Sequence, residues 1–422
     1  MASGTPRSFH NDEATGEDSL NRLQYARALA EVARTGGTPL VIGLYGTWGT
    51  GKTSLMRQIQ AALTKSEVPI ETVWFDAWQH QFDESPALSL MHTVVNTFQP
   101  GEKFEKGKKA LAVIATAWAS AAMKTVTAID AKDLQEFGKR YEDERFQVRD
   151  ARVRLREHFE QLIKVAQTSE KNRIVFFIDD LDRCLPKQTL EMLEALKLYL
   201  NLKNCMFFLG VDPKALERSI RHHYKDGYKE GEFSEVSYLD KIVQLPFHIP
   251  PIDDKDIGGY IDNLLPKELQ PCRELLIRGL GDNPRAVKRF INSLLLNHLL
   301  AKEASAVYKN DLQFSKVLAL VLLIQMLSPT LYARITKYPE LIRELKDTSE
   351  ERKALREKWL DTHEGLKSVF DMIDIPTNLE LKPFIFLTQA ARVTEAAANP
   401  HSTIDLLPAP GTSCGDDETD WS

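Results

Sequence analysis

Residues 46–53 read GTWGTGKT, and this stretch decides the expected fold. It fits the pattern G-x-x-x-x-G-K-[ST] of a phosphate-binding P-loop at every position. The apolar run PLVIGLYG precedes it, and SLMRQIQAALTK follows it with its apolar residues at helical spacing. A strand, a glycine-rich loop and a helix are therefore expected in this order. In such a turn the backbone N–H groups and the start of the helix form a cradle for an anion.

The residue types in the loop predict how a nucleoside triphosphate is held. Lys52 is expected to reach the β- and γ-phosphates, and the Thr53 hydroxyl to ligate Mg²⁺, which prefers a few oxygen ligands besides phosphates and water. The alternative is a glycine-rich turn with an exposed lysine and no ligand. The predicted nucleotide-binding residues are Gly46, Thr47, Trp48, Gly49, Thr50, Gly51, Lys52, Thr53 and Ser54.

A second apolar run, IVFFIDD at positions 174–180, ends in two aspartates. In a P-loop protein such a strand end completes the magnesium shell, so Asp179 is the predicted metal ligand. Asp180 is the candidate catalytic carboxylate that orients the attacking water. The alternative for both acids is that they cap the helix that follows.

Three further apolar runs have the length of buried strands: ETVWFDAW (71–78), NCMFFLGVD (204–212) and IVQLPFHIP (242–250). Helical or polar stretches separate them, which is typical of a three-layer α/β fold with a parallel sheet. From Asp256 to about Ala397 the apolar spacing is helical. The expected regions are a flexible N-terminus (1–17), a P-loop core (18–252) with a helical insertion (103–170), a helical lid (253–305), a C-terminal all-helical domain (306–397) and an acidic disordered tail (398–422).

Four signatures together make the chain resemble the KAP family of P-loop NTPases. They are the loop GTWGTGKTS, the strand VWFDAWQ, the acidic run FFIDDLDRC, and the pair YLDKIVQLPFHIPP with NPRAVKRFIN. The resemblance covers about Asp18 to Asn292 and implies a P-loop core of the additional-strand class with Mg-dependent ATP hydrolysis. It also implies a setting that is often membrane-linked or anti-phage. The positions that carry over are Lys52, Thr53, Asp179, Asp180, Asp182 and Arg183.

Three more residues are candidates for catalysis. Asp212 matches a polar strand-end position in related NTPases, and by strand direction it is expected beside the γ-phosphate. Arg285 and Arg289 lie one helical turn apart, so a lid helix could aim both at phosphates. For these two the alternatives are a solvated basic face and salt bridges to acids. A trans-acting arginine is an alternative for Arg218 and Arg221, where a surface role is favoured.

The net charge of the chain lacks the strongly basic balance that is typical of nucleic-acid-binding domains. The formal net charge of the 422 residues is −6. The segment after His401 holds five acids and no lysine or arginine, which leaves about −1 for the remainder. A domain-wide basic field is therefore absent from the sequence, and a local basic patch that binds nucleic acid stays an alternative. The first residues lack the apolar stretch of a signal peptide, so a cytoplasmic protein is expected.

One stretch, ALAVIATAWASAAMKTVTAI at 110–129, raises the question of a membrane span. Its uncharged part before Lys124 has fourteen residues, fewer than the roughly twenty that a span needs. Lys52 and Asp179 must also meet at one ion, which excludes a single crossing between them. A packed or partner-binding helix is expected, and a peripheral membrane anchor is the alternative. The run from Val317 to Leu327 is too short to span and is expected to be a buried helix.

The sequence as a whole predicts a cytoplasmic ATPase that uses Mg²⁺ and acts as a nucleotide-driven switch or assembly factor, with lid closure coupled to a protein partner or a second copy. ATP is favoured over GTP because no [NT]KxD motif is present. The alternatives are a scaffold that binds ATP with little turnover, a motor stimulated by nucleic acid, and a small-molecule kinase. An anti-phage role follows from the resemblance alone.

Overall fold

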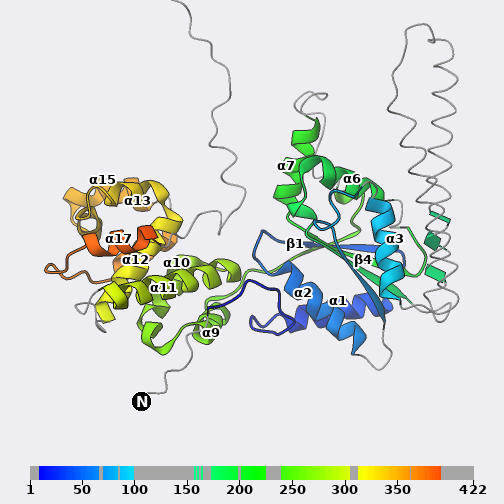
Figure 1. Cartoon of the computed structure of the whole chain (residues 1–422), viewed down its shortest axis with the longest axis horizontal. Coiled ribbons are helices and arrows are strands. Elements are labelled where there is room, and N and C mark those ends of the chain that lie inside the picture. Colours follow the sequence, from blue (N-terminus) through cyan, green and yellow to red (C-terminus); the bar gives the residue numbers. More distant parts are fainter. Residues whose placement is uncertain are drawn as a thin grey trace, which may run out of the picture. The chain divides into compact units, whose positions relative to one another are not determined.

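The computed structural model describes residues 9–65, 70–83, 86–98, 156–157, 159–160, 163–164, 173–197, 201–224, 239–304, 312–361 and 363–390. Most of the predicted insertion at 103–170, with its apolar stretch at 110–129, and the acidic tail lie outside these residues. The chain divides into two compact units (Figure 1). The sheet unit comprises Asp12–Tyr260, and the helical unit comprises Met1–Asn11 with Ile261–Ser422.

The sheet unit contains one five-stranded sheet in which every described pairing is parallel. This confirms the predicted fold class and all five predicted strands. The strand between the P-loop strand β1 and the acidic strand β3 is β4, as the additional-strand class requires. The spatial order is β2 (Glu71–Asp76), β3 (Ile174–Asp179), β4 (Cys205–Val211), β1 (Leu40–Tyr45) and β5 (Leu245–His248).

Helices cover both faces of this sheet and give the three predicted layers (Figure 1). On one face lie α1 (Leu23–Thr35) and α2 (Lys52–Thr64); on the other lie α3 (Pro86–Thr97), α6 (Pro186–Lys197) and α7 (Pro213–Tyr224). Neighbouring side chains of β3 point to opposite faces of the sheet. Phe176 stacks on Phe207 at 4.8 Å in one core, and Phe177 stacks on Phe208 at 5.2 Å in the other. Both faces are buried, which explains why these strands are apolar at nearly every position.

The strand register brings the carboxyl ends of four strands to one edge. Asp76 at the end of β2 is opposite Asp179 at the end of β3. Tyr45 of β1 is opposite Val211 of β4, so the P-loop and Asp212 leave the sheet side by side. A short 3₁₀ helix, η1 (Leu181–Arg183), follows β3 at this same edge. The fold therefore gathers most of the predicted site residues where ligands bind in open α/β sheets.

The helical unit supplies the predicted C-terminal helices. The helix α12 (Leu312–Leu327) is apolar all round, and the run from Val317 to Ile324 is 0% exposed, which confirms the expected buried helix. The helix α9 (Asp254–Leu264) passes from one unit into the other, and the remaining elements are η2 (Lys267–Cys272), α10 (Arg273–Leu280), α11 (Pro284–Ala304), α12 (Leu312–Leu327), α13 (Pro329–Ile335), α14 (Leu341–Lys346), α15 (Glu350–Leu360), α16 (Glu364–Met372) and α17 (Lys382–Ala390).

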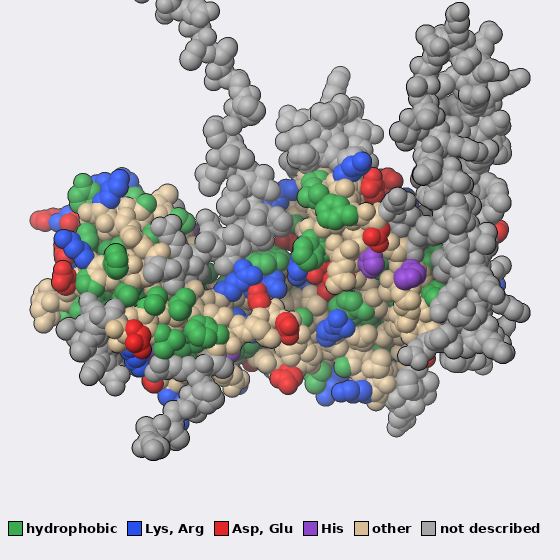
Figure 2. Space-filling model, viewed as in Figure 1, with side chains coloured by type: hydrophobic (Ala, Val, Ile, Leu, Met, Phe, Trp, Pro, Cys, Tyr) green, Lys and Arg blue, Asp and Glu red, His purple; other side chains and the backbone are tan. Residues whose placement is uncertain are grey.

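The surface of the described residues carries mixed charge. Lysine and arginine side chains lie interspersed with aspartate and glutamate on the visible face of each unit (Figure 2). This agrees with the near-neutral charge of the chain outside its tail. Of the helices that the structure describes, none has both the length and the apolar character needed to cross a bilayer.

Candidate functional site

The loop between β1 and α2 has the backbone that its glycines predict. The Gly46 N–H donates to the Val211 carbonyl at 3.2 Å and fixes the start of the loop to the end of β4. Gly49 and Gly51 have backbone φ angles of 86° and 92°, which residues with a side chain rarely adopt. α2 begins at the next residue, Lys52. The positive end of this helix therefore lies directly at the loop.

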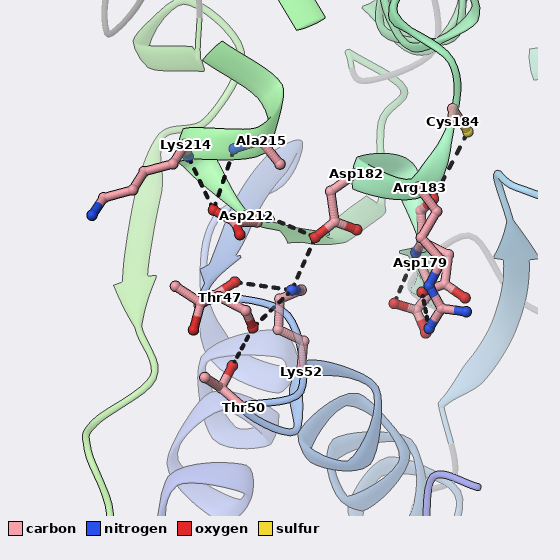
Figure 3. A network of polar contacts seen from close by, with 12 residues as sticks. Thr47, Thr50, Lys52, Asp179, Asp182, Arg183, Cys184, Asp212, Lys214 and Ala215 are labelled. Atoms are coloured by element: carbon pink, nitrogen blue, oxygen red, sulfur yellow. Dashed lines mark hydrogen bonds and ion pairs between the residues drawn. The ribbon is translucent and has the colours of Figure 1, made fainter. Parts of the chain in front are cut away.

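Lys52 folds across the loop and reaches the acidic motif (Figure 3). Its Nζ donates to the carbonyls of Gly46 at 2.9 Å and Thr47 at 3.3 Å. The same Nζ lies 3.0 Å from the Asp182 carboxylate, and both side chains are almost completely buried, with 8% and 4% exposure. The lysine is thus an ion-paired, buried group in this arrangement. A phosphate in the loop has to compete with Asp182 for it.

The two predicted metal ligands lie together. The Asp179 carboxylate, 3% exposed, accepts hydrogen bonds from the Thr53 hydroxyl and, at 2.9 Å, from the Asp180 N–H. Burial raises the pKa of Asp179, and these two hydrogen bonds oppose that rise. A Cβ on Gly210 of β4 would lie only 3.1 Å from this carboxylate, so the glycine leaves room for it. Two oxygens beside a phosphate loop fit the coordination that Mg²⁺ prefers.

Asp180 has a different environment from its neighbour. Its backbone is left-handed, with φ 56°, a conformation that aspartate and asparagine tolerate. Its carboxylate pairs with the Arg183 guanidinium at 2.8 Å. Burial, followed by the charge of Asp179, raises the pKa of Asp180 to about 7, although Arg183 lowers it. A carboxylate with a pKa near neutrality is suited to accept a proton in catalysis.

This raised pKa makes a prediction about stability. Without Mg²⁺, the folded protein should keep a proton on Asp180 that the unfolded chain loses near pH 4. The free energy of unfolding should therefore fall as the pH rises from about 4 to about 7. Urea unfolding in EDTA at several pH values measures this fall. The fall should be smaller in Asp180→Asn, and an equal fall in both proteins would contradict the assignment.

Asp212 lies at the predicted strand end, but its side chain has a structural task. Its Oδ1 accepts the N–H groups of Lys214 at 3.0 Å and Ala215 at 3.4 Å, which caps α7 (Figure 3). Its own N–H donates to Asp182 at 3.1 Å. Asp182 therefore joins Lys52 to the end of β4. A catalytic role for Asp212 stays a prediction, since the cap already explains an acid here.

The predicted arginines lie on other elements. Arg285 and Arg289 are on α11 of the helical unit, where Asn283 caps the helix start by accepting the Arg285 N–H at 3.1 Å. Their contact with a phosphate remains a prediction. Arg218 donates from Nε to the Lys214 carbonyl of its own helix. The Arg221 side chain lies outside the described residues.

The two aromatic residues of β2 are packed, and the aromatic residue beyond its end is half exposed. Trp74 stacks on Phe177 at 5.5 Å, and Phe75 is 0% exposed. Trp78 lies in the turn beyond the strand end and is 48% exposed. Asp76 accepts the Gln79 N–H at 3.1 Å and so fixes the start of this turn.

One residue at the site was not predicted. The buried guanidinium of Arg22 donates to the Thr50 carbonyl of the P-loop and, at 3.1 Å, to the Pro250 carbonyl. A sequence signal does exist. Arg22 precedes Ala26 by four positions and so begins the buried stripe of α1, which continues through Ala26, Leu29, Ala30 and Ala33. A cation at the first position of an apolar stripe is expected to have a buried partner.

One family model matches more than half of the chain. Residues 22–301 match the model of the KAP family P-loop domain. None of the curated proteins matches the chain. Among solved structures, the Aeropyrum pernix ORC1 protein in complex with DNA is 13% identical, with 88% of this chain and 82% of that chain covered and a TM-score of 0.36. The Aeropyrum pernix ORC2 protein, in ADPNP-ADP complexes, is 13% identical, with 90% and 88% covered and a TM-score of 0.40.

Proposed function

Because the chain belongs to the KAP family of P-loop NTPases, we propose that it is a Mg²⁺-dependent ATP hydrolase whose nucleotide state drives a switch or assembly step. One observation carries the proposal. The loop lysine and the Thr53–Asp179 pair meet at one edge of the sheet, with Asp180 next to them. These are the parts that phosphoryl transfer to water requires: an anion cradle, a cation, a metal site and a carboxylate.

Each residue has a distinct role in the proposed reaction. The loop N–H groups and the start of α2 bind the phosphates, and Lys52 neutralises charge on the β- and γ-phosphates. Thr53 and Asp179 would hold Mg²⁺, which supplies further charge neutralisation when bound. Asp180 orients a water molecule, whose oxygen bonds to the γ-phosphorus as the β–γ bridge bond breaks. The proton of that water passes to the Asp180 carboxylate.

The Lys52–Asp182 pair supports a switch in addition to hydrolysis. Asp182 accepts both Lys52 Nζ at 3.0 Å and the Asp212 N–H at 3.1 Å. When Lys52 turns to a phosphate, Asp182 loses one of these two partners. Asp212 in turn caps α7, so this change of partner would alter the hydrogen bonds at the end of β4 and at the start of that helix. Nucleotide binding is therefore linked to an element outside the loop.

The partner of the switch is proposed on family grounds. A protein partner or a second copy of the chain is the expected recipient, and the anti-phage setting rests on family membership alone. A specific observation favours one second candidate, a scaffold that binds ATP with little turnover. Lys52 pairs with Asp182 at 3.0 Å, and a lysine engaged in this way neutralises less charge on a γ-phosphate, which would favour binding over turnover.

Phosphate release from ATP by the purified full chain tests the proposal. We expect release in Mg²⁺ and loss of release in EDTA, with little change on adding DNA or RNA. Tight ATP binding without phosphate release would favour the scaffold. Strong stimulation by nucleic acid with a steep salt dependence would favour a motor. Transfer of the phosphoryl group to a small molecule without free phosphate would favour a kinase.

A further inference from the structure

Arg22 is fixed in the sheet unit before its side chain begins. Asp18 accepts the Arg22 N–H at 2.7 Å and the Leu23 N–H at 2.9 Å, one with each carboxylate oxygen. The Arg22 carbonyl accepts the N–H groups of Tyr25 and Ala26 in the first turn of α1. The residue as a whole is 7% exposed. Its guanidinium therefore extends from a rigid base.

The guanidinium contacts the part of the P-loop with the most conformational freedom. It donates from Nη1 to the carbonyl of Thr50, which lies between the two left-handed glycines Gly49 and Gly51. Nη1 would lie only 3.1 Å from a Cβ at position 51, so the close approach also needs that glycine. Glycines lose more backbone freedom than other residues when a loop is ordered. A contact at Thr50 restricts the loop where this freedom is largest.

The geometry of the peptide unit links this contact to phosphate binding. The Thr50 carbonyl and the Gly51 N–H belong to the same peptide, and in a trans peptide they point in opposite directions. With the carbonyl turned to Arg22, the Gly51 N–H is turned away from it. Donors that are oriented before a ligand arrives bind it without an ordering cost.

The second contact of Arg22 anchors the loop to the sheet. Nη2 donates to the Pro250 carbonyl at 3.1 Å. Pro250 follows Ile249, whose N–H donates to the Tyr45 carbonyl at 2.8 Å and continues the pairing of β5 with β1. The guanidinium is thus held between the loop and the chain that leaves β5. Its planar fork can serve both carbonyls at once, which an ammonium cannot do with the same geometry.

We propose that Arg22 is a positioning residue of the nucleotide site, which orders the Thr50–Gly51 peptide of the P-loop for phosphate binding. The inference rests on the proposed function. Arg22 lies behind the loop and acts through the loop backbone. Its loss should weaken ground state and transition state binding alike, which raises KM and leaves kcat nearly unchanged.

The test compares Arg22→Ala and Arg22→Lys with wild type and with Arg34→Ala. Arg34 is a matched control. It lies in the last turn of α1, whose N-terminal cap is Arg22, and its guanidinium donates a hydrogen bond to the Ala62 carbonyl at 2.6 Å. Ala62 is near the end of α2 that is far from the P-loop. We expect Arg22→Ala to raise the Kd and KM for ATP about tenfold or more with kcat within about threefold. Arg22→Lys should lie between, and Arg34→Ala should keep the wild-type Kd.

Thermal unfolding of each variant separates a positioning role from a structural one. If Arg22 had only a structural role, Arg22→Ala would lower the Tm, as Arg34→Ala would. The Kd of Arg22→Ala for ATP, measured at a temperature below the Tm, would then equal that of wild type. That result for Arg22→Ala would overturn the inference while the proposed function stands. If Arg22→Ala does not fold, Arg22→Lys decides, and a wild-type Kd in that variant overturns the inference. A wild-type chain that binds no ATP overturns the proposed function and this inference together.

Discussion

Asp180→Asn is expected to lower the rate of ATP hydrolysis about 10²- to 10⁴-fold and to leave ATP binding as tight as in wild type or tighter. The substitution removes the group that takes the proton from water. It keeps the backbone, because asparagine tolerates the left-handed conformation that Asp180 has, with φ 56°. It also removes a negative charge beside the phosphates. Phosphate release and equilibrium binding of ATP, measured on the same preparation, check both parts.

Asp76→Asn is the matched control for this change. Asp76 is also a strand-end carboxylate, it lies opposite Asp179 in the sheet register, and its charge contributes to the raised pKa of Asp180. It holds the Gln79 N–H, which an asparagine oxygen can still accept. We expect hydrolysis within about tenfold of wild type in this control. If Asp180→Asn leaves the rate unchanged, the chain is better described as a scaffold that binds ATP.

The sheet and the loop could be predicted because their causes are local. Strands buried on both faces are apolar at nearly every position, so runs such as that ending at Asp179 are visible in one sequence. The left-handed backbone at positions 49 and 51 needs glycine, and this makes the P-loop a short, recognisable pattern. The direction of the strands then places Asp179 and Asp212 at the edge where the loop lies.

The contacts of Lys52 and Arg22, which are buried at the site, could not be predicted in the same way. The pair of Lys52 with Asp182 joins residues 130 positions apart in the chain, and Arg22 reaches both Thr50 and Pro250. Such contacts depend on three elements meeting, and periodicity carries no information on this.

The Lys52–Asp182 pair should show opposite effects on folding and on ATP binding. In Asp182→Asn, the amide oxygen can still accept the Asp212 N–H, but Lys52 loses its counter-charge in a site where it is 8% exposed. Leaving one member of a buried pair uncompensated costs about 3–5 kcal/mol. We expect about 3 kcal/mol, at the low end of this range, because Lys52 keeps the carbonyls of Gly46 and Thr47. ATP should nevertheless bind more tightly, since no carboxylate then competes with the phosphates.

A double-mutant cycle with Lys52→Met separates the pair from its surroundings. Lys52→Met removes the charge, keeps a long apolar side chain, and should weaken ATP binding and abolish hydrolysis. If the two groups stabilise each other, the double variant should lose less free energy of unfolding than the two single losses combined, by about 1 kcal/mol or more. Urea unfolding in EDTA gives these values. Additive losses, or an Asp182→Asn variant that binds ATP more weakly than wild type, would show that Asp182 does not restrain the lysine. The exchange of Lys52 between Asp182 and phosphate, on which the proposed switch depends, would then have no basis.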